Sequence, residues 1–156
     1  MLHRRARAGI ALAAMLLFAA ACDDSPTEPA GSVRFETVLK TTLGGPAPSL
    51  EGRQAIRDRG SLQAVWDELH EGPPPPLPDI AFGREMVIVA LGPGCGGSVE
   101  ITAIDRERLE LVVRGQAKSC GNTLCFREDF SVHAVRLPRS DGPVSLRIPT
   151  PEPGLC

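Results

Sequence analysis

Hydrophobic and polar residues alternate with a period of two in several short stretches of the chain, which is the pattern of half-buried β-strands. The clearest stretches are VRFETVLK (33–40), SVEITAI (98–104), LELVVRG (109–115), DFSVHAVRL (129–137) and VSLRIP (144–149). The side chains expected to face inward are Val33, Phe35, Thr37, Leu39, Val99, Ile101, Ala103, Leu109, Leu111, Val113, Phe130, Val132, Ala134, Val144, Leu146 and Ile148.

Other stretches depart from this alternation. EMVIVALG (85–92) is apolar from Met86 to Leu91, which predicts a strand covered on both faces. TTLGGPAPSLEGRQ (41–54) is rich in Gly and Pro and predicts a loop. GPPPPLPDI (72–80) predicts a stiff polyproline spacer.

An amphipathic helix is predicted between these two connections, with Ser61 as its N-cap. Four apolar residues share the i, i+3, i+4, i+7 spacing of one buried stripe. They are Leu62, Val65, Trp66 and Leu69. On this stripe Trp66 is expected to anchor the core rather than to form a ligand platform. Six short strands, Gly-containing turns and one early helix predict an α+β, mostly β domain with largely antiparallel strands.

The start of the chain predicts export. Three arginines precede the apolar run Gly9–Ala21, which is too short to span a membrane, and Cys22 follows directly. The ending FAAAC resembles a bacterial lipobox, so residues 1–21 are expected to be a lipoprotein signal peptide and Cys22 to carry the lipid. An ordinary secretory signal is the alternative. Residues 22–32 predict a flexible tether and 33–156 a single domain, held on the outer side of the inner membrane or on the outer membrane.

Charge argues against a nucleic-acid partner. Removal of residues 1–21 takes away three arginines and no acid, which leaves 14 basic residues against 19 acidic ones. No run of like charge and no lysine cluster occurs in the sequence. Because DNA and RNA are bound through basic patches, this composition predicts no nucleic-acid binding.

The chain has five cysteines, and lipid on Cys22 would leave an even set of four. In an exported domain such a set is expected to form disulfides. The first choice of pairing joins Cys120 to Cys125 across a tight GNTL turn and leaves Cys95 for Cys156, with two other connectivities open. A four-thiolate zinc site would need a second close pair, and a thioredoxin-like centre needs a CxxC spacing. Neither is expected here.

No catalytic motif occurs in the sequence. His70 is expected to end the helix at the negative pole of its dipole, and His133 stands alone in a strand and is expected to face solvent. The loop GPGCGGS (92–98) is expected to be a strand-to-strand turn pinned by Cys95, rather than a phosphate-binding loop. Its candidate contact residues are Gly92, Gly94, Gly96, Gly97 and Ser98. We therefore expect no enzyme activity, no cofactor and no metal.

The order of these features resembles the C-terminal domain of the protease complex subunit PrcB family. The similar stretches are FETV (35–38), LQAVWDEL (62–69), PDIAFGREMVIVALG (78–92) and LELVVRG (109–115), and the resemblance extends over residues 35–148. In that family the helix with its tryptophan leads to a P-x-x-DF segment, an apolar strand that ends in Gly, and a TGGY turn.

The turn at CGGS departs from the family pattern. Cys95 stands where the family usually has Thr, and Ser98 replaces the aromatic residue after the double glycine. Asp129 precedes Phe130 where a proline and an aromatic residue are common. The cysteine indicates that a disulfide makes this turn rigid.

The resemblance implies an exported, non-catalytic partner protein. Many members are lipoproteins, and the founding member stabilises a secreted subtilisin-like protease. We therefore expect a membrane-anchored interaction or accessory domain for an exported protease, with VSLRIP (144–149) or the turn at 92–98 as its contact surface. One alternative is a lipoprotein that binds small ligands or envelope polysaccharide, which the aromatic content of 4% and the lack of Tyr disfavour. The other is a thiol oxidoreductase that uses Cys120 and Cys125.

Overall fold

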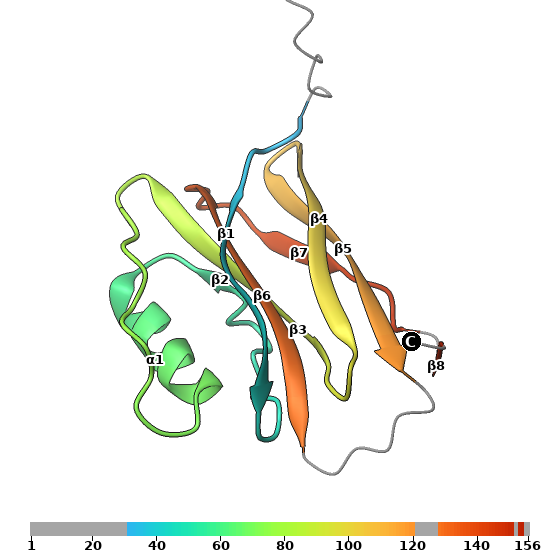
Figure 1. Cartoon of the computed structure of the whole chain (residues 1–156). Helices are drawn as coiled ribbons and strands as arrows, with labels where there is room; N and C mark the ends of the chain where they lie inside the picture. The colour runs from blue at the N-terminus through green and yellow to red at the C-terminus, as the bar shows by residue number, and fades with distance from the viewer. Residues whose placement is uncertain (1–30, 121–127, 152, 155–156) are drawn as a thin grey trace, which may run out of the picture.

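The computed structural model describes residues 31–120, 128–151 and 153–154, which form eight strands and one helix (Figure 1). In chain order these are β1 (Glu36–Gly44), β2 (Ala55–Ile56), α1 (Arg59–Leu69), β3 (Glu85–Pro93), β4 (Ser98–Glu107), β5 (Glu110–Cys120), β6 (Asp129–Pro138), β7 (Val144–Arg147) and β8 (Pro153–Gly154). The predicted α+β, mostly β class is confirmed. The two strands beyond the expected six are the two-residue elements β2 and β8.

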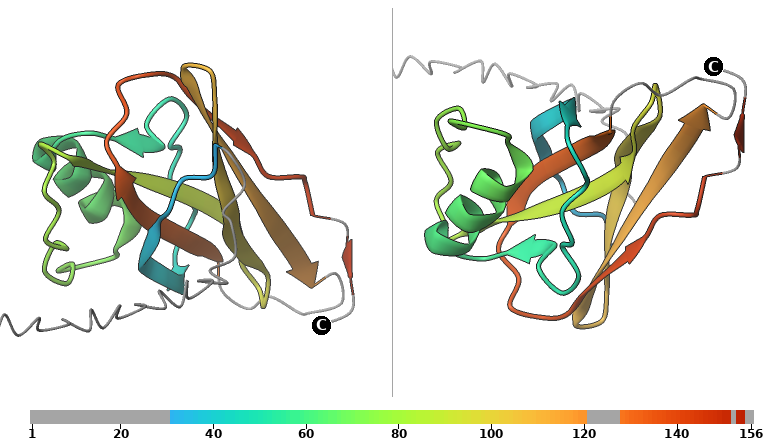
Figure 2. Two further views of the ribbon diagram at one scale, coloured as in Figure 1. Left: turned by 90° about the horizontal axis from the view of Figure 1, so that it is seen from above. Right: turned by 90° about the horizontal axis from the view of Figure 1, so that it is seen from below.

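The strands form two sheets. Sheet one has the order β1-β6-β3-β2 and sheet two the order β4-β5-β7. Figure 2 shows α1, sheet one and sheet two as three successive layers. Most strand pairs are antiparallel, as predicted, but β5 pairs in parallel with both β7 and β8. Within the described residues, no helix is long and apolar enough to cross a membrane.

Strand β3 is covered on both faces, which explains its continuous apolar sequence and confirms the prediction for Met86–Leu91. Successive side chains of a strand point to opposite faces. Val87 and Val89 pack into the core beneath α1. Met86 and Ile88 pack into the core between the two sheets. Strand β6 lies between β1 and β3 and divides its side chains between the two cores in the same way.

Helix α1 buries its predicted stripe. Trp66 is 4% exposed and its indole N–H donates to the Pro75 carbonyl at 3.0 Å, so this residue is a core anchor. The predicted N-cap is wrong, because the helix begins at Arg59 and Asp58 caps it. The Asp58 carboxylate accepts from the backbone N–H of Ser61 at 2.8 Å, which is the usual N-cap contact. His70 follows the last helical residue, as predicted, and its ring Nδ1 lies 2.8 Å from the Trp66 carbonyl oxygen.

The predicted inward face of residues 33–40 is wrong after Phe35. Phe35 packs between the two sheets, but Leu39 packs beneath α1 and Thr37 is exposed. A bulge between Thr37 and Leu39 causes the change, because one extra residue reverses the parity of a strand. The strand also continues to Gly44, so the first part of the predicted loop 41–54 is strand.

A second bulge, in β4 between Ile101 and Ala103, makes Ile104 the buried residue where Ala103 was predicted. Leu109 was also predicted to face inward, and it is 85% exposed. Glu107 and Glu110 are the last paired residues of the β4–β5 hairpin, so Arg108 and Leu109 form its two-residue tip.

The two sheets are joined along one side of the sandwich. There the chain before β1 lies against β4, since the N–H of Val33 donates to the Ile104 carbonyl at 2.8 Å and that of Arg106 to Gly31 at 2.7 Å. Ser32 also pairs with Asp105, so the predicted tether is two residues too long. We call this the closed side. On the opposite side, the open side, the edges β2 and β7 share no backbone hydrogen bond among the described residues.

Candidate functional site

A cleft lies along the open side, between the edge of sheet one at β2 and the edge of sheet two at β7. It comprises two pockets of about 310 and 320 Å³, and Gln54 and Leu146 line both. The larger pocket is walled mainly by apolar side chains from both sheets and the loop before β2. They are Pro48, Leu50, Val89, Leu91, Leu146 and Ile148. We call the two pockets together the open-side cleft.

The backbone of β7 presents hydrogen-bonding groups to this cleft. The N–H of Leu111 donates to the Pro143 carbonyl at 2.9 Å, which fixes the phase of the parallel β5–β7 ladder. In a parallel ladder, alternate residues of each strand bond to the partner. Ser145 therefore bonds to β5, whereas the N–H and C=O groups of Val144 and Leu146 point away from it. Among the described residues, β5 is the sole strand neighbour of β7.

One side chain bridges the sheets at the end of the cleft. The guanidinium of Arg57, which follows β2, donates to the carbonyl of Ser140 at 2.8 Å and to that of Gly142 at 2.6 Å. Both acceptors lie in the connection from β6 to β7. This contact links the start of β7 to sheet one beside the cleft.

The turn at 92–98 is built into the fold. The Asp129 carboxylate accepts from the N–H of Cys95, and a Cβ on Gly94 would lie 1.8 Å from that carboxylate and 2.1 Å from the Asp129 carbonyl oxygen. A Cβ on Gly92 would meet Val99 at 2.6 Å. The other candidate contact residues differ in exposure: Gly97 is buried, whereas Gly96 and Ser98 are exposed. Close packing therefore explains the glycines here without a ligand.

The two described cysteines near this turn form disulfide bonds. Cys95 and Cys120 are both disulfide-bonded, and Cys120 is 7% exposed. The predicted pairing joins them to Cys156 and Cys125, which lie outside the described residues, as does Cys22. The pairing and the lipidation therefore stay predictions.

His133 was predicted to face solvent, and it is buried between the sheets at 2% exposure. Its strand, β6, packs on one face into the core beneath α1 and on the other face, which carries His133, against sheet two. Ring Nδ1 accepts from the backbone N–H of Ile101 in β4 at 2.8 Å. Ring Nε2 lies 2.9 Å from the hydroxyl oxygen of Thr37 in β1. One imidazole thus links three strands on the closed side.

The protonation of His133 follows from these contacts. Because Nδ1 accepts a hydrogen bond, the proton of the neutral ring is on Nε2, which donates to Thr37. A general base would need a free lone pair toward the hydroxyl, and none remains. Burial lowers the pKa of His133, as does the nearby Lys40 cation, while Glu100 acts in the opposite direction. The geometry and the pKa both favour a neutral, structural histidine.

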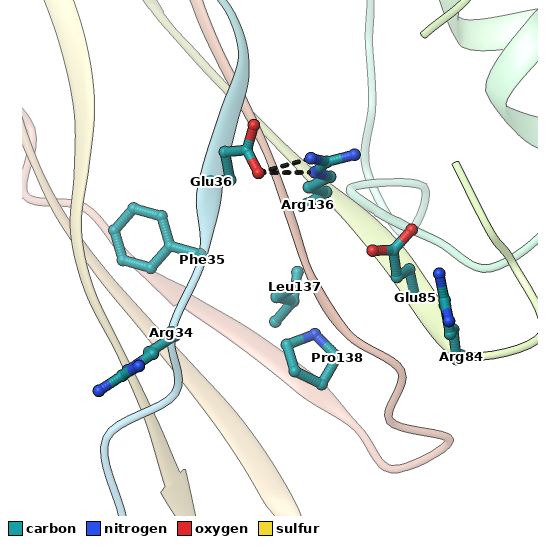
Figure 3. A pocket seen from close by; sticks show the side chains of 8 residues that line it. All are labelled: Arg34, Phe35, Glu36, Arg84, Glu85, Arg136, Leu137 and Pro138. Atoms are coloured by element: carbon teal, nitrogen blue, oxygen red, sulfur yellow. Dashed lines mark hydrogen bonds and ion pairs between the residues drawn. The ribbon is translucent and has the colours of Figure 1, made fainter. Parts of the chain in front are cut away.

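A further pocket of about 420 Å³ opens where β1 and β3 begin and β6 ends (Figure 3). The Arg136 guanidinium binds the Glu36 carboxylate at 2.6 Å, so one of the cations in this pocket is already paired. Apolar and charged side chains line it together. They are Arg34, Phe35, Glu36, Arg84, Glu85, Arg136, Leu137 and Pro138.

Comparison with known proteins identifies no relative: no family model, no curated protein and no solved structure matches the chain. The resemblance to the PrcB family stays a prediction. Within the part of the chain that the structure describes, no group of three His, Cys, Asp or Glu side chains is placed to hold a metal ion.

Sequence reasoning named one wall of the open-side cleft and missed the other. VSLRIP was predicted as an edge, and it supplies Leu146 and Ile148. The opposite wall comes from the stretch 41–54, whose Gly and Pro content conceals Leu50 and Gln54 as structural residues. The sequence did contain a signal for the burial of His133, because apolar residues of its strand lie both on its own face, at Val135, and on the opposite face, at Val132 and Ala134.

Proposed function

We propose that this protein is a membrane-anchored, non-enzymatic lipoprotein whose domain binds an extended segment of an exported partner protein. The observation that carries the proposal is the outer edge of β7, which pairs with no other strand among the described residues and lies beside the open-side cleft. An exposed strand edge is normally blocked by charge, proline or covering chain, since it invites further pairing. The residues whose backbone groups point outward, Val144 and Leu146, are apolar, and the charge and prolines of this edge lie beside them at Arg147, Pro143 and Pro149.

Strand addition uses both features of this site. The outward N–H and C=O groups of Val144 and Leu146 would pair with the backbone of an added strand. Alternate side chains of that strand would point into the open-side cleft, whose apolar walls favour aliphatic residues. The expected partner is an exported protease, in agreement with the family resemblance, and the lipid on Cys22 would keep the complex at the membrane.

The alternatives have less support. A thiol oxidoreductase needs an accessible sulfur, whereas Cys120 is disulfide-bonded and 7% exposed. A small-ligand function would use the pocket of about 420 Å³, where Glu36 already binds Arg136. Of the four described aromatic side chains, Trp66 and Phe130 are buried and Phe35 and Phe82 are half-buried, so little stacking surface is available for a polysaccharide.

The test compares two substitutions at Val144. Val144→Pro removes the outward N–H, and proline is tolerated at an edge position that does not bond to its neighbour. Val144→Ala truncates the side chain and keeps the N–H, which makes it the matched control. Each lipidated protein would be isolated from its native membranes after mild crosslinking, and the co-purifying proteins identified by mass.

We expect one exported protease to be recovered in stoichiometric amount with the unchanged protein and with Val144→Ala, and to be lost with Val144→Pro. Equal recovery with Val144→Pro would exclude the β7 edge as the contact. Recovery of the unchanged protein alone would contradict the accessory function itself.

A further inference from the structure

We infer that the end of the domain at Gly31 rests on an anionic membrane surface, with Leu109 inserted among the lipid headgroups. We call this the tether end. It consists of the start of β1, the tip of the β4–β5 hairpin and the start of β3 (Figure 1). The inference rests on the lipidation of Cys22 proposed above, and it assigns an orientation that a lipid anchor alone does not provide.

The two residues of the hairpin tip are not those that favour its backbone conformation or its exposure to solvent. Leu109 is 85% exposed and is the one large hydrophobic side chain exposed among the described residues. Arg108 beside it has a φ of 58°, a left-handed conformation that glycine adopts at lower cost. A Gly and a polar residue would suit an isolated two-residue tip better than Arg and Leu. The sequence therefore presents a cation and an apolar side chain together at the tip of the hairpin.

The charges at the tether end favour an anionic partner. Arg84, Arg106 and Arg108 are exposed and form no ion pair with the described residues. Some of the acids are paired, since Arg114 binds both Asp105 and Glu107 at 2.9 and 2.8 Å, whereas Glu110 beside the tip forms no ion pair with the described residues. Glu36 and Asp141 are likewise paired with arginines. Three cations therefore remain available on a mature protein whose 19 acidic residues outnumber its 14 basic ones.

The length of the tether keeps this end near the bilayer. Nine peptide units link Cys22 to Gly31, so covalent geometry limits their separation to about 30 Å. The ten-residue strand β4 separates the hairpin tip from Ser98 by a further distance of about 30 Å. Basic residues near an anionic surface are attracted to it, and an adjacent leucine gains from burial at the headgroup boundary. Phosphate groups of an anionic bilayer are therefore the occupant that fits this surface.

The experiment reads depth with a tryptophan at each end of β4. The lipidated full-length protein would carry Leu109→Trp or, as the matched control, Ser98→Trp, which is exposed at the far end. Each would be reconstituted into vesicles of phosphatidylcholine and phosphatidylglycerol with brominated acyl chains, which quench inserted tryptophan. The unchanged protein corrects for Trp66, which is buried.

We expect the emission of Leu109→Trp to shift to the blue and to be quenched, and that of Ser98→Trp to match the aqueous protein. Adding Arg106→Glu and Arg108→Glu, or omitting phosphatidylglycerol, should reduce the quenching at position 109. If the protein floats with the vesicles and neither position is quenched, or both are equally, the orientation is refuted. If the protein does not float with the vesicles, the lipid anchor has failed as well.

Discussion

The closed and open sides of the sandwich differ in what crosses between the sheets. On the closed side, backbone hydrogen bonds join the chain before β1 to β4, the imidazole of His133 joins β6 to β4 and β1, and Lys40 pairs with Glu100. On the open side, the described contacts beside the cleft come from two guanidinium groups, with Arg57 donating to the β6–β7 connection and Arg139 of that connection donating to the Arg57 carbonyl. The closed side therefore has hydrogen bonds and an ion pair between the sheets, whereas on the open side the outward N–H and C=O groups of β7 have no partner among the described residues.

This difference separates structural chemistry from candidate binding chemistry. Histidine is a common catalytic base, yet both ring nitrogens of His133 form hydrogen bonds within the fold. Val144 and Leu146 have no reactive groups, yet their backbone is available for recognition. The candidate binding site of this protein is therefore marked by the availability of hydrogen-bonding groups rather than by residue type.

The largest expected effect is on the closed side. His133→Ala would leave the buried N–H of Ile101 without an acceptor and create a cavity, so we expect unfolding to become easier by about 2–4 kcal/mol. Urea denaturation measures this change. His133→Asn is the matched control, because its side-chain oxygen can occupy the place of Nδ1 and restore most of the loss. Equal losses for Ala and Asn would show that the Ile101 contact contributes little.

A smaller effect on stability is expected from removal of the Arg57 contact on the open side. Arg57→Ala removes two hydrogen bonds to carbonyl groups that water can reach, and we expect a loss of about 1 kcal/mol in unfolding free energy. The position of β7 should loosen, and partner recovery should fall with it. If Arg57→Ala has wild-type stability and recovers as much partner as the unchanged protein, Arg57 does not hold β7 in position beside the cleft.

The pH dependence of stability tests the closed side without removing a side chain. The pKa of His133 is lowered from 6.5 by burial and Lys40, so the unfolded chain takes up this proton at a higher pH than the folded domain. Stability should be full above the unfolded value and should fall as pH drops below it toward the folded pKa. His133→Asn should lack this loss in the same window, where carboxylates remain ionised. Identical pH profiles for the two proteins would refute the assignment.

The smallest effect is expected for the exposed Lys40–Glu100 pair. Lys40→Gln should change the urea midpoint little, because exposed ion pairs are screened by water and salt. It should raise the pKa of Glu100, which Lys40 and Gln116 lower, in an NMR titration. A large loss of stability would mean that this pair, rather than His133, joins the two sheets.

The sequence predicted the features that depend on local periodicity. The helical stripe around Trp66 and the doubly covered strand at Met86–Leu91 follow from spacing alone, and both are confirmed. Prediction from the sequence failed where the packing and pairing of strands determine which side chains are buried. His133 is buried because its face of β6 packs against sheet two, and Leu39 changes face because β1 contains a bulge. The open-side cleft was only half visible, since it joins residues near 50 to residues near 146 across two sheets.

Amide hydrogen exchange of the purified domain tests the central claim most directly. The account predicts that the N–H groups of Val144 and Leu146 exchange rapidly, while those of Ser145 and Arg147, which point to β5, and of Val33 on the closed side are protected. Addition of the captured partner should then slow exchange at Val144 and Leu146 specifically. Slow exchange at Val144 and Leu146 in the free protein would show that the β7 edge is already covered, and it would contradict the proposed binding site.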